Sequence, residues 1–352
     1  MIRSRQLILR LLAAAGLWAS AACAQGRTAD GIAGPPTTAP DPGFAAWVGG
    51  STVDVSTTPI GGVYLGGGGT DIDAGMKWLL ARGGARATNQ FGDVVVLRAS
   101  GSDGYNSYLL DFGANSVTSI LITTVAGANS DYVRRAIERA EVIFLAGGDQ
   151  SKYVSLWKGT SLVTAVNARI AAGFPIGGTS AGLAVLGEYV YSADNASTTS
   201  TVALANPYDA SITLTTALFN VPLLRNVLTD SHFRTRDRMG RLMAFLARIQ
   251  QDRIANTLPL AIGVDEQSGV GVLADQSAMV FGPGSGAYFL KITPESTRLC
   301  VSATPLTLTN VVTQSVAPGQ TFHLGAWSGP AARSYTLSVT AGILTSSATG
   351  VY

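Results

Sequence analysis

The chain has 352 residues, of which 47% are hydrophobic and only 13% are charged. This length predicts about two domains, or one large α/β unit with extensions. So few charges together with 41 glycines exclude a coiled coil and a highly charged disordered chain. A net charge of +2 gives no electrostatic basis for nucleic-acid binding, and two histidines are too few for a multi-histidine metal site.

The first 24 residues are typical of a secretory signal peptide. Two arginines precede a short apolar run over residues 11–22, and Ala22-Cys23-Ala24 is an A-x-A cleavage site. Because the run is too short for a good membrane span, we expect a secreted or periplasmic protein with no stable membrane span after cleavage. A lipoprotein attached at Cys23 is less favoured, since Ser20 stands where a large aliphatic residue is normally found.

Residues 25–57 are rich in Gly, Pro, Thr and Ala and predict a flexible leader. Short apolar runs then alternate with segments of helical periodicity, such as 131–140, as far as residue 290. This alternation predicts βαβ units and an α/β fold whose mostly parallel sheet is sandwiched by helices. The expected strands lie at 63–65, 94–97, 120–123, 142–145, 174–176 and 261–264.

The sequence changes character after the α/β region of residues 58–290. Residues 291–352 are rich in Thr, Val, Ser and Gly, which predicts a β-rich C-terminal extension. His323 lies there in an alternating segment, where we expect an ordinary strand histidine. A catalytic imidazole would therefore have to come from His232.

The segment Gly178-Thr179-Ser180-Ala181-Gly182 has the G-x-S-x-G spacing of a nucleophile elbow. Its small residues permit a sharp turn from strand to helix that exposes the serine hydroxyl. The main-chain N–H of Ala181, at the start of that helix, is positioned to stabilise an oxyanion. The alternative is a glycine-rich structural turn.

His232 immediately precedes a helical pattern that begins near Met239. An isolated histidine at this point is a natural general base for Ser180. Four arginines lie within eight positions of each other beside His232: Arg234, Arg236, Arg238 and Arg241. The alternative interpretation of this segment is a solvated basic helix face.

Two further strands end in groups suited to catalysis. The strand at 261–264 ends in Asp265 and Glu266, and either carboxylate could orient His232 as the third member of a triad. The strand at 142–145 leads into paired glycines, where the N–H of Gly148 can approach an oxyanion and Gln150 can contact substrate. A capping acid and a bare glycine turn are the respective alternatives.

The run Gly66–Gly69 carries a weaker signal. It lacks the G-x-G-x-x-G spacing of a dinucleotide site, so we interpret it as a turn at the end of a strand.

In this order, the four segments around residues 147–150, 177–182, 230–241 and 262–266 resemble the peptidase S51 family, and within it the cyanophycinase branch. The resemblance spans roughly residues 60–290 and implies a fold similar to the flavodoxin-like class I glutamine amidotransferases. It implies Ser180 as nucleophile, His232 as general base and Glu266 as the orienting acid. It also implies substrate contacts from Gln150, Asp230, Arg236, Arg238 and Arg241.

The resemblance implies a substrate as well. Cyanophycinases cleave a polyaspartate whose β-carboxyls carry arginine, releasing β-Asp-Arg dipeptides through an acyl-enzyme and without a cofactor. Arginines around the site suit a substrate that carries carboxylates. The alternatives are an aspartyl dipeptidase-like enzyme acting on other Asp-containing peptides, and a non-catalytic binding protein of the cell envelope. The family resemblance also suggests a homodimer.

Overall fold

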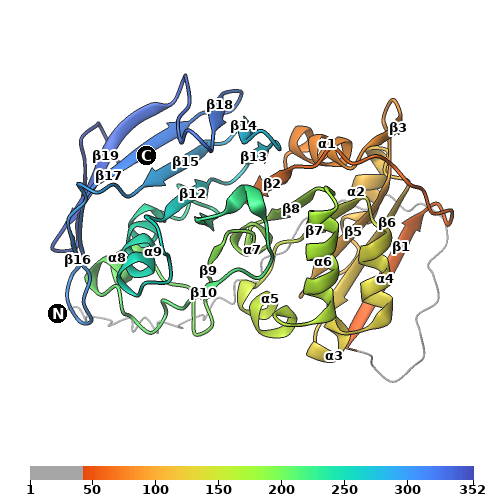
Figure 1. The fold of residues 1–352 in the computed structure, drawn as a ribbon, viewed down its shortest axis with the longest axis horizontal. Helices are drawn as coiled ribbons and strands as arrows, with labels where there is room; N and C mark the ends of the chain where they lie inside the picture. The colour runs from red at the N-terminus through yellow and green to blue at the C-terminus, as the bar shows by residue number, and fades with distance from the viewer. Residues whose placement is uncertain (1–42) are drawn as a thin grey trace, which may run out of the picture. The chain divides into compact units, whose positions relative to one another are not determined.

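A computed structural model describes residues 43–352, which form two nine-stranded sheets, a small two-stranded ribbon and the helices α1–α9 (Figure 1). The predicted signal peptide and the first part of the predicted leader lie outside the described residues. Across the described range, no helix is both long enough and apolar enough to cross a bilayer.

Five parallel strands form the centre of the first sheet, as the alternating pattern predicts. In spatial order they are β6 (Ser116–Ile122), β5 (Asp93–Arg98), β7 (Val142–Leu145), β8 (Ile176–Thr179) and β2 (Val63–Gly66). Antiparallel strands extend the sheet at both edges. These are β1 (Phe44–Gly50) beside β6, and β13 (Gly269–Val272), β14 (Ser277–Phe281) and β18 (Thr321–His323) beyond β2.

Successive side chains of the parallel strands point to opposite faces of the sheet and enter different cores. Val95 and Leu97 belong to one apolar cluster, whereas Val94 and Val96 belong to another. The sheet is therefore sandwiched by helices, as predicted. One face packs against α1 (Asp73–Arg82) and α2 (Asn106–Asp111), and the other packs against α4 (Asp131–Arg139), α5 (Gln150–Trp157) and α6 (Ser161–Ala171).

The second sheet contributes to the same core as the first. Val190, Ile262 and Phe289 on one of its faces join the cluster that contains Val95, and its other face packs against α8 (Ser200–Ala205) and α9 (Met239–Gln251). The central layer of side chains thus lies between the two sheets. The path of the second sheet is β10 (Leu214–Thr216), β9 (Tyr189–Tyr191), β11 (Val227–Asp230), β12 (Leu260–Val264), β15 (Ala287–Lys291), β17 (Thr307–Val316), β19 (Arg333–Thr340) and β20 (Ile343–Ser346), with β16 (Arg298–Leu299) paired to β17.

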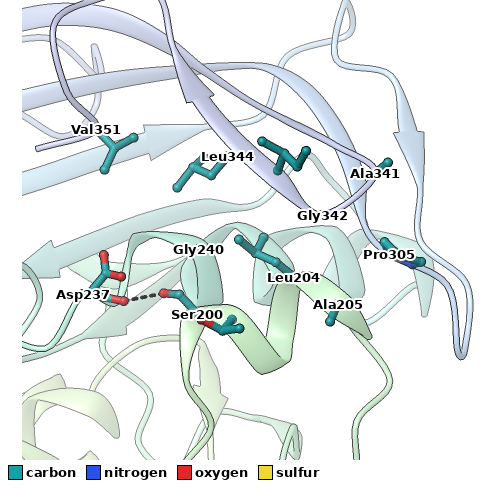
Figure 2. A pocket seen from close by; sticks show the side chains of 12 residues that line it. Ser200, Leu204, Ala205, Asp237, Gly240, Pro305, Ala341, Gly342, Leu344 and Val351 are labelled. Atoms are coloured by element: carbon teal, nitrogen blue, oxygen red, sulfur yellow. Dashed lines mark hydrogen bonds between the residues drawn. The ribbon is translucent and has the colours of Figure 1, made fainter.

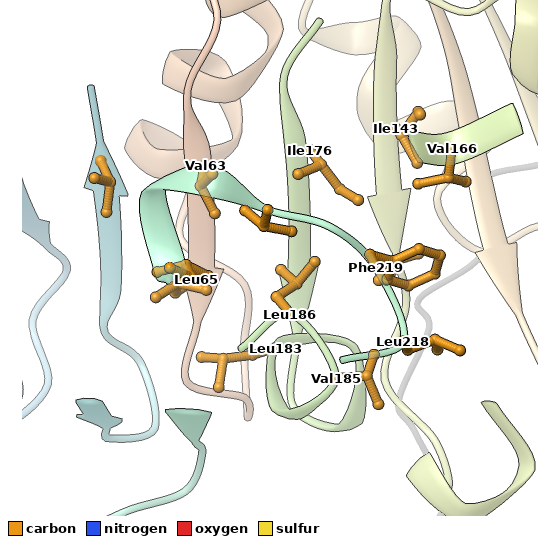
Figure 3. Packing of buried hydrophobic residues seen from close by; sticks show 14 of the residues in the cluster. Val63, Leu65, Ile143, Val166, Ile176, Leu183, Val185, Leu186, Leu218 and Phe219 are labelled. Carbon is orange, nitrogen blue, oxygen red and sulfur yellow. The ribbon is translucent and has the colours of Figure 1, made fainter. Parts of the chain in front are cut away.

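The short helix α7 (Ala181–Ala184) is anchored in this central layer. Leu183 and Leu186 belong to the same cluster as Val63, Leu65 and Ile176 from the strands beside them (Figure 3). Close packing of this kind restrains the backbone on both sides of a residue. The turn at Ser180 is therefore held by apolar side chains that follow it.

Residues 44–50, predicted as part of the flexible leader, form the edge strand β1 instead. It runs antiparallel to β6, from Phe44 opposite Ile122 to Gly50 opposite Ser116, and the Phe44 ring stacks on Tyr132 at a centroid distance of 5.3 Å. The strand itself, FAAWVGG, is mostly apolar but short. The Gly, Pro and Thr residues that flank it within residues 25–57 dominate the composition of that range and concealed the strand.

The predicted C-terminal β structure is present, and it joins both sheets rather than forming an appended one. β18 pairs with β14 in the first sheet, whereas β17, β19 and β20 continue the second sheet from β15. The exposed His323 lies on β18, as expected of an ordinary strand histidine.

Candidate active site

Ser180 occupies a strained turn between β8 and α7. Its φ is +55°, in the left-handed region that non-glycine residues rarely adopt. The flanking glycines make the turn possible: a Cβ on Gly178 would lie 2.5 Å from the carbonyl carbon of Gly182, and one on Gly182 would lie 2.1 Å from the Leu145 oxygen. The G-x-S-x-G spacing thus reflects a close approach of backbone segments on both sides of the serine.

Ser180, His232 and Glu266 form one chain of hydrogen bonds. Ser180 Oγ lies 2.7 Å from His232 Nε2, and His232 Nδ1 lies 2.6 Å from Glu266 Oε1. The other carboxylate at this strand end, Asp265, accepts main-chain hydrogen bonds in the turn that follows His232. A hydroxyl, an imidazole and a carboxylate in this arrangement can move a proton from the serine to the imidazole.

The surroundings of His232 favour its neutral form. Burial lowers the pKa of His232 below its ordinary value, and the nearby charges of Arg236 and Arg238 act in the same direction. The hydrogen bond that His232 donates to the Glu266 carboxylate raises the pKa of His232 without cancelling this effect. An imidazole that is neutral near pH 7 can accept a proton.

Two main-chain donors beside Ser180 are free to bind an oxyanion. Within residues 43–352, the N–H groups of Ala181 and Gly148 donate to no protein acceptor. The adjacent glycines Gly147 and Gly148 lie close to the serine, since a Cβ on Gly147 would be 3.4 Å from Ser180 Cβ. Free donors fixed beside a nucleophile stabilise negative charge on a carbonyl oxygen. In the described part of the chain, no cluster of His, Cys, Asp or Glu side chains is arranged to hold a metal ion.

The loop Gly66–Gly69, which we interpreted as a simple turn, contacts the other members of the hydrogen-bonded chain. Gly68 has a φ of +99°, and a Cβ there would lie 2.3 Å from His232 Cε1. The main-chain N–H of His232 donates to the Gly67 oxygen at 2.7 Å, and that of Gln267 donates to the Gly68 oxygen at 3.0 Å. The signal in the sequence was the run of four glycines at a strand end, where only glycine lets the backbone pass over an imidazole.

Asp230 and Arg241, predicted to contact substrate, are buried and bound to each other. Their exposed fractions are 3% and 1%, and Arg241 Nε donates to Asp230 Oδ2 at 2.8 Å. Burial alone would raise the pKa of Asp230, but the guanidinium groups of Arg241 and Arg238 hold that pKa below its ordinary value. Both groups are thus occupied within the protein, and the structure does not present them to a ligand.

The remaining predicted substrate contacts differ in accessibility. The Arg236 side chain is 53% exposed, with Nε 3.6 Å from Glu266 Oε1. Arg238 is mostly buried, donates to the Ser231 oxygen at 2.9 Å, and has its pKa lowered to about 10 by burial. Gln150 is half-buried at the first residue of α5. Because α9 begins only at Met239, Arg236 and Arg238 lie in the turn before that helix, on no helix face.

Asp71 is a further group near the serine that the motifs did not reveal. Its Oδ2 accepts a hydrogen bond from the Tyr105 hydroxyl at 2.6 Å, and the hydroxyl of Thr179, the residue before Ser180, lies beside it. Burial raises the pKa of Asp71. Among the ion pairs of residues 43–352, none involves Asp71.

Comparisons with known proteins point to a single family of peptidases. The sequence model described as "Peptidase family S51" matches residues 104–257. The chain is 29% identical to a cyanophycinase of Trichormus variabilis over 217 residues, which cover 61% of this chain and 67% of that protein. It is 30% identical to a cyanophycinase of Synechococcus elongatus over 182 residues, or 51% of each chain.

Among solved structures, a peptidase from an acI-B1 Actinobacterium superimposes with a TM-score of 0.51 at 15% identity. The superposition covers 76% of this chain and 98% of that structure. At so low an identity, the likeness concerns the fold alone. It agrees with the arrangement of a mostly parallel sheet between helices.

Proposed function

We propose that the chain is a serine-type hydrolase of peptidase family S51 and that it cleaves cyanophycin, a polyaspartate whose β-carboxyls carry arginine, to β-Asp-Arg dipeptides. The observation that carries the proposal is the chain of hydrogen bonds from Ser180 through His232 to Glu266. The similarity to two cyanophycinases supports this choice of substrate.

In the proposed reaction, Ser180 Oγ attacks the carbonyl carbon of the scissile amide while its proton passes to His232 Nε2. Glu266 accepts the Nδ1–H hydrogen bond and stabilises the resulting imidazolium. The N–H groups of Ala181 and Gly148 bind the oxyanion. The intermediate expels the amine, which takes the proton from Nε2, and leaves an acyl-enzyme. A water molecule deprotonated by the same imidazole then releases the acid and restores the serine.

The charges around Ser180 support a substrate that is both anionic and cationic. The exposed guanidinium of Arg236 can pair with a substrate carboxylate. Asp71 lacks a cationic partner in the described part of the chain, and a largely buried carboxylate is stabilised when a cation joins it. We therefore assign the arginine side chain of the substrate to Asp71 and Tyr105 rather than to Asp230, for which the family resemblance implied a substrate contact.

The proposal is tested by incubating the protein, with residues 1–24 removed, with cyanophycin and with α- and β-aspartyl dipeptides. Products are identified by mass. We expect release of β-Asp-Arg from the polymer, and a loss of at least about 10³-fold in Ser180→Ala. The variant should keep its circular dichroism spectrum and unfolding midpoint.

A parallel reaction with a fluorophosphonate separates the nucleophile from the substrate. Labelling of Ser180 without release from any substrate would overturn cyanophycin hydrolysis and leave the serine hydrolase standing. Release from dipeptides alone would favour the aspartyl dipeptidase alternative. If neither labelling nor release occurs in a folded protein, the proposed hydrolase is wrong.

The role of Asp71 gives a prediction of its own. Asp71→Asn keeps the side-chain shape and removes the negative charge. We expect KM for cyanophycin to rise about tenfold, because a charge-assisted bond to the substrate is lost, while the rate of fluorophosphonate labelling stays unchanged. An unchanged KM would show that Asp71 does not bind the guanidinium.

A further inference from the structure

The turn over residues 231–238 connects β11 to α9 and carries His232. Two of its residues, His232 and Asp237, have φ values of +46° and +48°. For residues other than glycine this conformation is strained, and it persists only where surrounding contacts impose it. At His232 the contact is with Gly67, described above. Asp237, at the other end of the turn, is held differently.

The contacts that hold Asp237 come from Tyr352 and Ser200. The Tyr352 hydroxyl donates to Asp237 Oδ1 at 2.8 Å and accepts from the Met239 N–H at 2.9 Å. Ser200 Oγ donates to the Asp237 main-chain oxygen (Figure 2). It also accepts from the Arg241 N–H at 3.2 Å. These contacts bracket the junction between the turn and α9.

Hydrogen bonds rather than packing hold the exposed side chain of Asp237 at this junction. Ser200 and Asp237 line a cavity of about 470 Å³ between α8 and the β19–β20 hairpin (Figure 2). With open space on that side, no close-packed neighbour restrains the Asp237 side chain there. Loss of the Tyr352 hydroxyl would therefore leave the carboxylate free to move.

The ring of Tyr352 also reaches the catalytic end of the turn. It makes an edge contact with Phe233, the residue that follows His232, with 6.0 Å between centroids and an interplanar angle of 80°. Phe233 is fully buried. The side chain of Tyr352 thus contacts the turn at two places. Its ring contacts the residue after His232, and its hydroxyl binds at the start of α9.

Tyr352 is itself fixed to the second sheet. Arg333 on β19 donates from Nη1 to the Tyr352 main-chain oxygen at 3.0 Å and from Nη2 to the Thr349 oxygen at 2.7 Å. The hydroxyl of Tyr335, on the same strand, donates to the Val351 oxygen at 2.9 Å. Because these hydrogen bonds fix Tyr352 to β19, the position of the second sheet determines where Tyr352 holds the turn.

We propose that Tyr352 is a positioning residue, which holds the 231–238 turn so that His232 stays in line between Ser180 and Glu266. It touches no reacting atom and acts through Asp237, Met239 and Phe233. The inference rests on the proposed function only for the role of His232 as the general base. It gives the β-rich tail, which lies outside the matched residues 104–257, a part in the reaction.

Two histidines in the whole chain make a direct test available. Protein labelled with ¹⁵N-histidine gives signals from His232 and from His323, and the latter, on β18, serves as an internal reference. In Tyr352→Phe, which keeps the ring and removes the hydroxyl, we expect the His232 signals to shift. Its pKa should rise toward the ordinary value as water reaches the loosened turn, and the His323 signals should stay in place.

Tyr208→Phe is the matched control. It removes a tyrosine hydroxyl that binds Asp252 at the far end of α9, so it reproduces the chemical change away from the turn. We expect fluorophosphonate labelling to slow about tenfold in Tyr352→Phe, since small misplacements of catalytic groups have effects of this order or larger. Tyr208→Phe should leave both the labelling rate and the His232 signals unchanged.

Asp237 variants test the same contact from the other side. Asp237→Asn keeps an oxygen acceptor and tolerates a positive φ, so it should behave like the parent protein, whereas Asp237→Ala should resemble Tyr352→Phe. The double variant Tyr352→Phe/Asp237→Ala should be no worse than Tyr352→Phe alone, because both substitutions remove the same hydrogen bond between Tyr352 and Asp237.

These readouts keep the outcomes distinct. Unchanged His232 signals in folded Tyr352→Phe would overturn the positioning role, whatever the substrate proves to be. If Tyr352→Phe is too unstable to measure, equal His232 signals in Asp237→Ala and Asp237→Asn would overturn it in the same way. Failure to cleave cyanophycin would affect the proposed function alone, since the titration requires no turnover.

Discussion

His232 shows how a single side chain is set for its task by groups of opposite effect. Burial and two arginines favour the neutral ring, while Glu266 holds the ring in line with Ser180. Motif spacing and the family resemblance singled out these three residues in the sequence, and the structure places them within hydrogen-bonding distance of one another. Strand position alone left Asp265 and Glu266 as alternatives, and the family resemblance chose Glu266; the fold shows that Asp265 supports the turn instead.

This setting predicts the pH dependence of the enzyme. A base works when unprotonated, so kcat/KM should be constant near neutral pH and fall as the pH drops through the lowered pKa of His232. In Arg236→Gln, loss of a nearby positive charge should raise that pKa and move the acid limb to higher pH. A pH–rate profile of both proteins checks this; an acid limb that stays in place or moves to lower pH would contradict it.

The buried pair of Asp230 and Arg241 marks the limit of what spacing predicts at the residue scale. Four arginines within eight positions were recognisable, but their exposures in the fold range from half-exposed to fully buried. The exposure of each arginine depends on where α9 begins and on the sheet behind that helix. Neither can be predicted from the local sequence.

Arg241→Met should therefore act on stability first. Removing Arg241 leaves the buried Asp230 carboxylate with Arg238, 3.4 Å away, as its remaining cationic partner, and breaking a buried ion pair costs about 3–5 kcal/mol in free energy of unfolding. Arg236→Met, at an exposed site, should change that free energy by no more than about 0.5 kcal/mol. Urea denaturation measures both. A stable Arg241→Met protein with a raised KM would instead restore the substrate-binding role.

At the scale of elements, strands were easier to predict than the loops between them. The apolar runs of β2, β5 and β7 indicated buried strands, and the structure places all three in the centre of the first sheet. The loop Gly66–Gly69 was undervalued, because its importance comes from His232, which is more than 160 residues away in the chain. A run of glycines indicates that another group lies close to the backbone, but it does not identify that group.

Gly68→Ala tests that loop. The new methyl group would overlap the His232 ring, so we expect activity to fall by about 10² or more. Gly159→Ala is the matched control, since Gly159 also has a positive φ, of +78°, but a Cβ there would have no other atom within 4 Å. Both should lose roughly 1–2 kcal/mol of stability through the backbone, and only Gly68→Ala should lose activity. Equal activities would contradict the contact.

At the scale of the whole molecule, the tail is part of the core. Leu308, Val311, Leu337 and Val339 are fully buried in the cluster that α9 also enters. Composition predicted β structure in this segment correctly, but not its pairing with strands of both sheets. Pairing over such distances depends on the assembled fold, as it does for β1.

Deletion of residues 295–352 should therefore abolish folding rather than release a free α/β unit. It removes β17, the neighbour of β15, and exposes apolar side chains such as Tyr288 and Leu290. We expect an insoluble product without a cooperative unfolding transition. Ile343→Ser, at an exposed tail position, should fold normally. A soluble, active deletion protein would show that the tail is dispensable.

The route of the tail has a mechanical consequence. The chain passes from β17 in the second sheet to β18 in the first and back to β19 in the second, so the tail connects the two sheets covalently. Hinge closure needs two bodies joined by a few flexible residues, and these sheets are joined by several crossings and a common core. We expect substrate to enter through movements of side chains and short turns. The two sheets should not close over a bound substrate, which leaves room for a polymer to extend beyond the site.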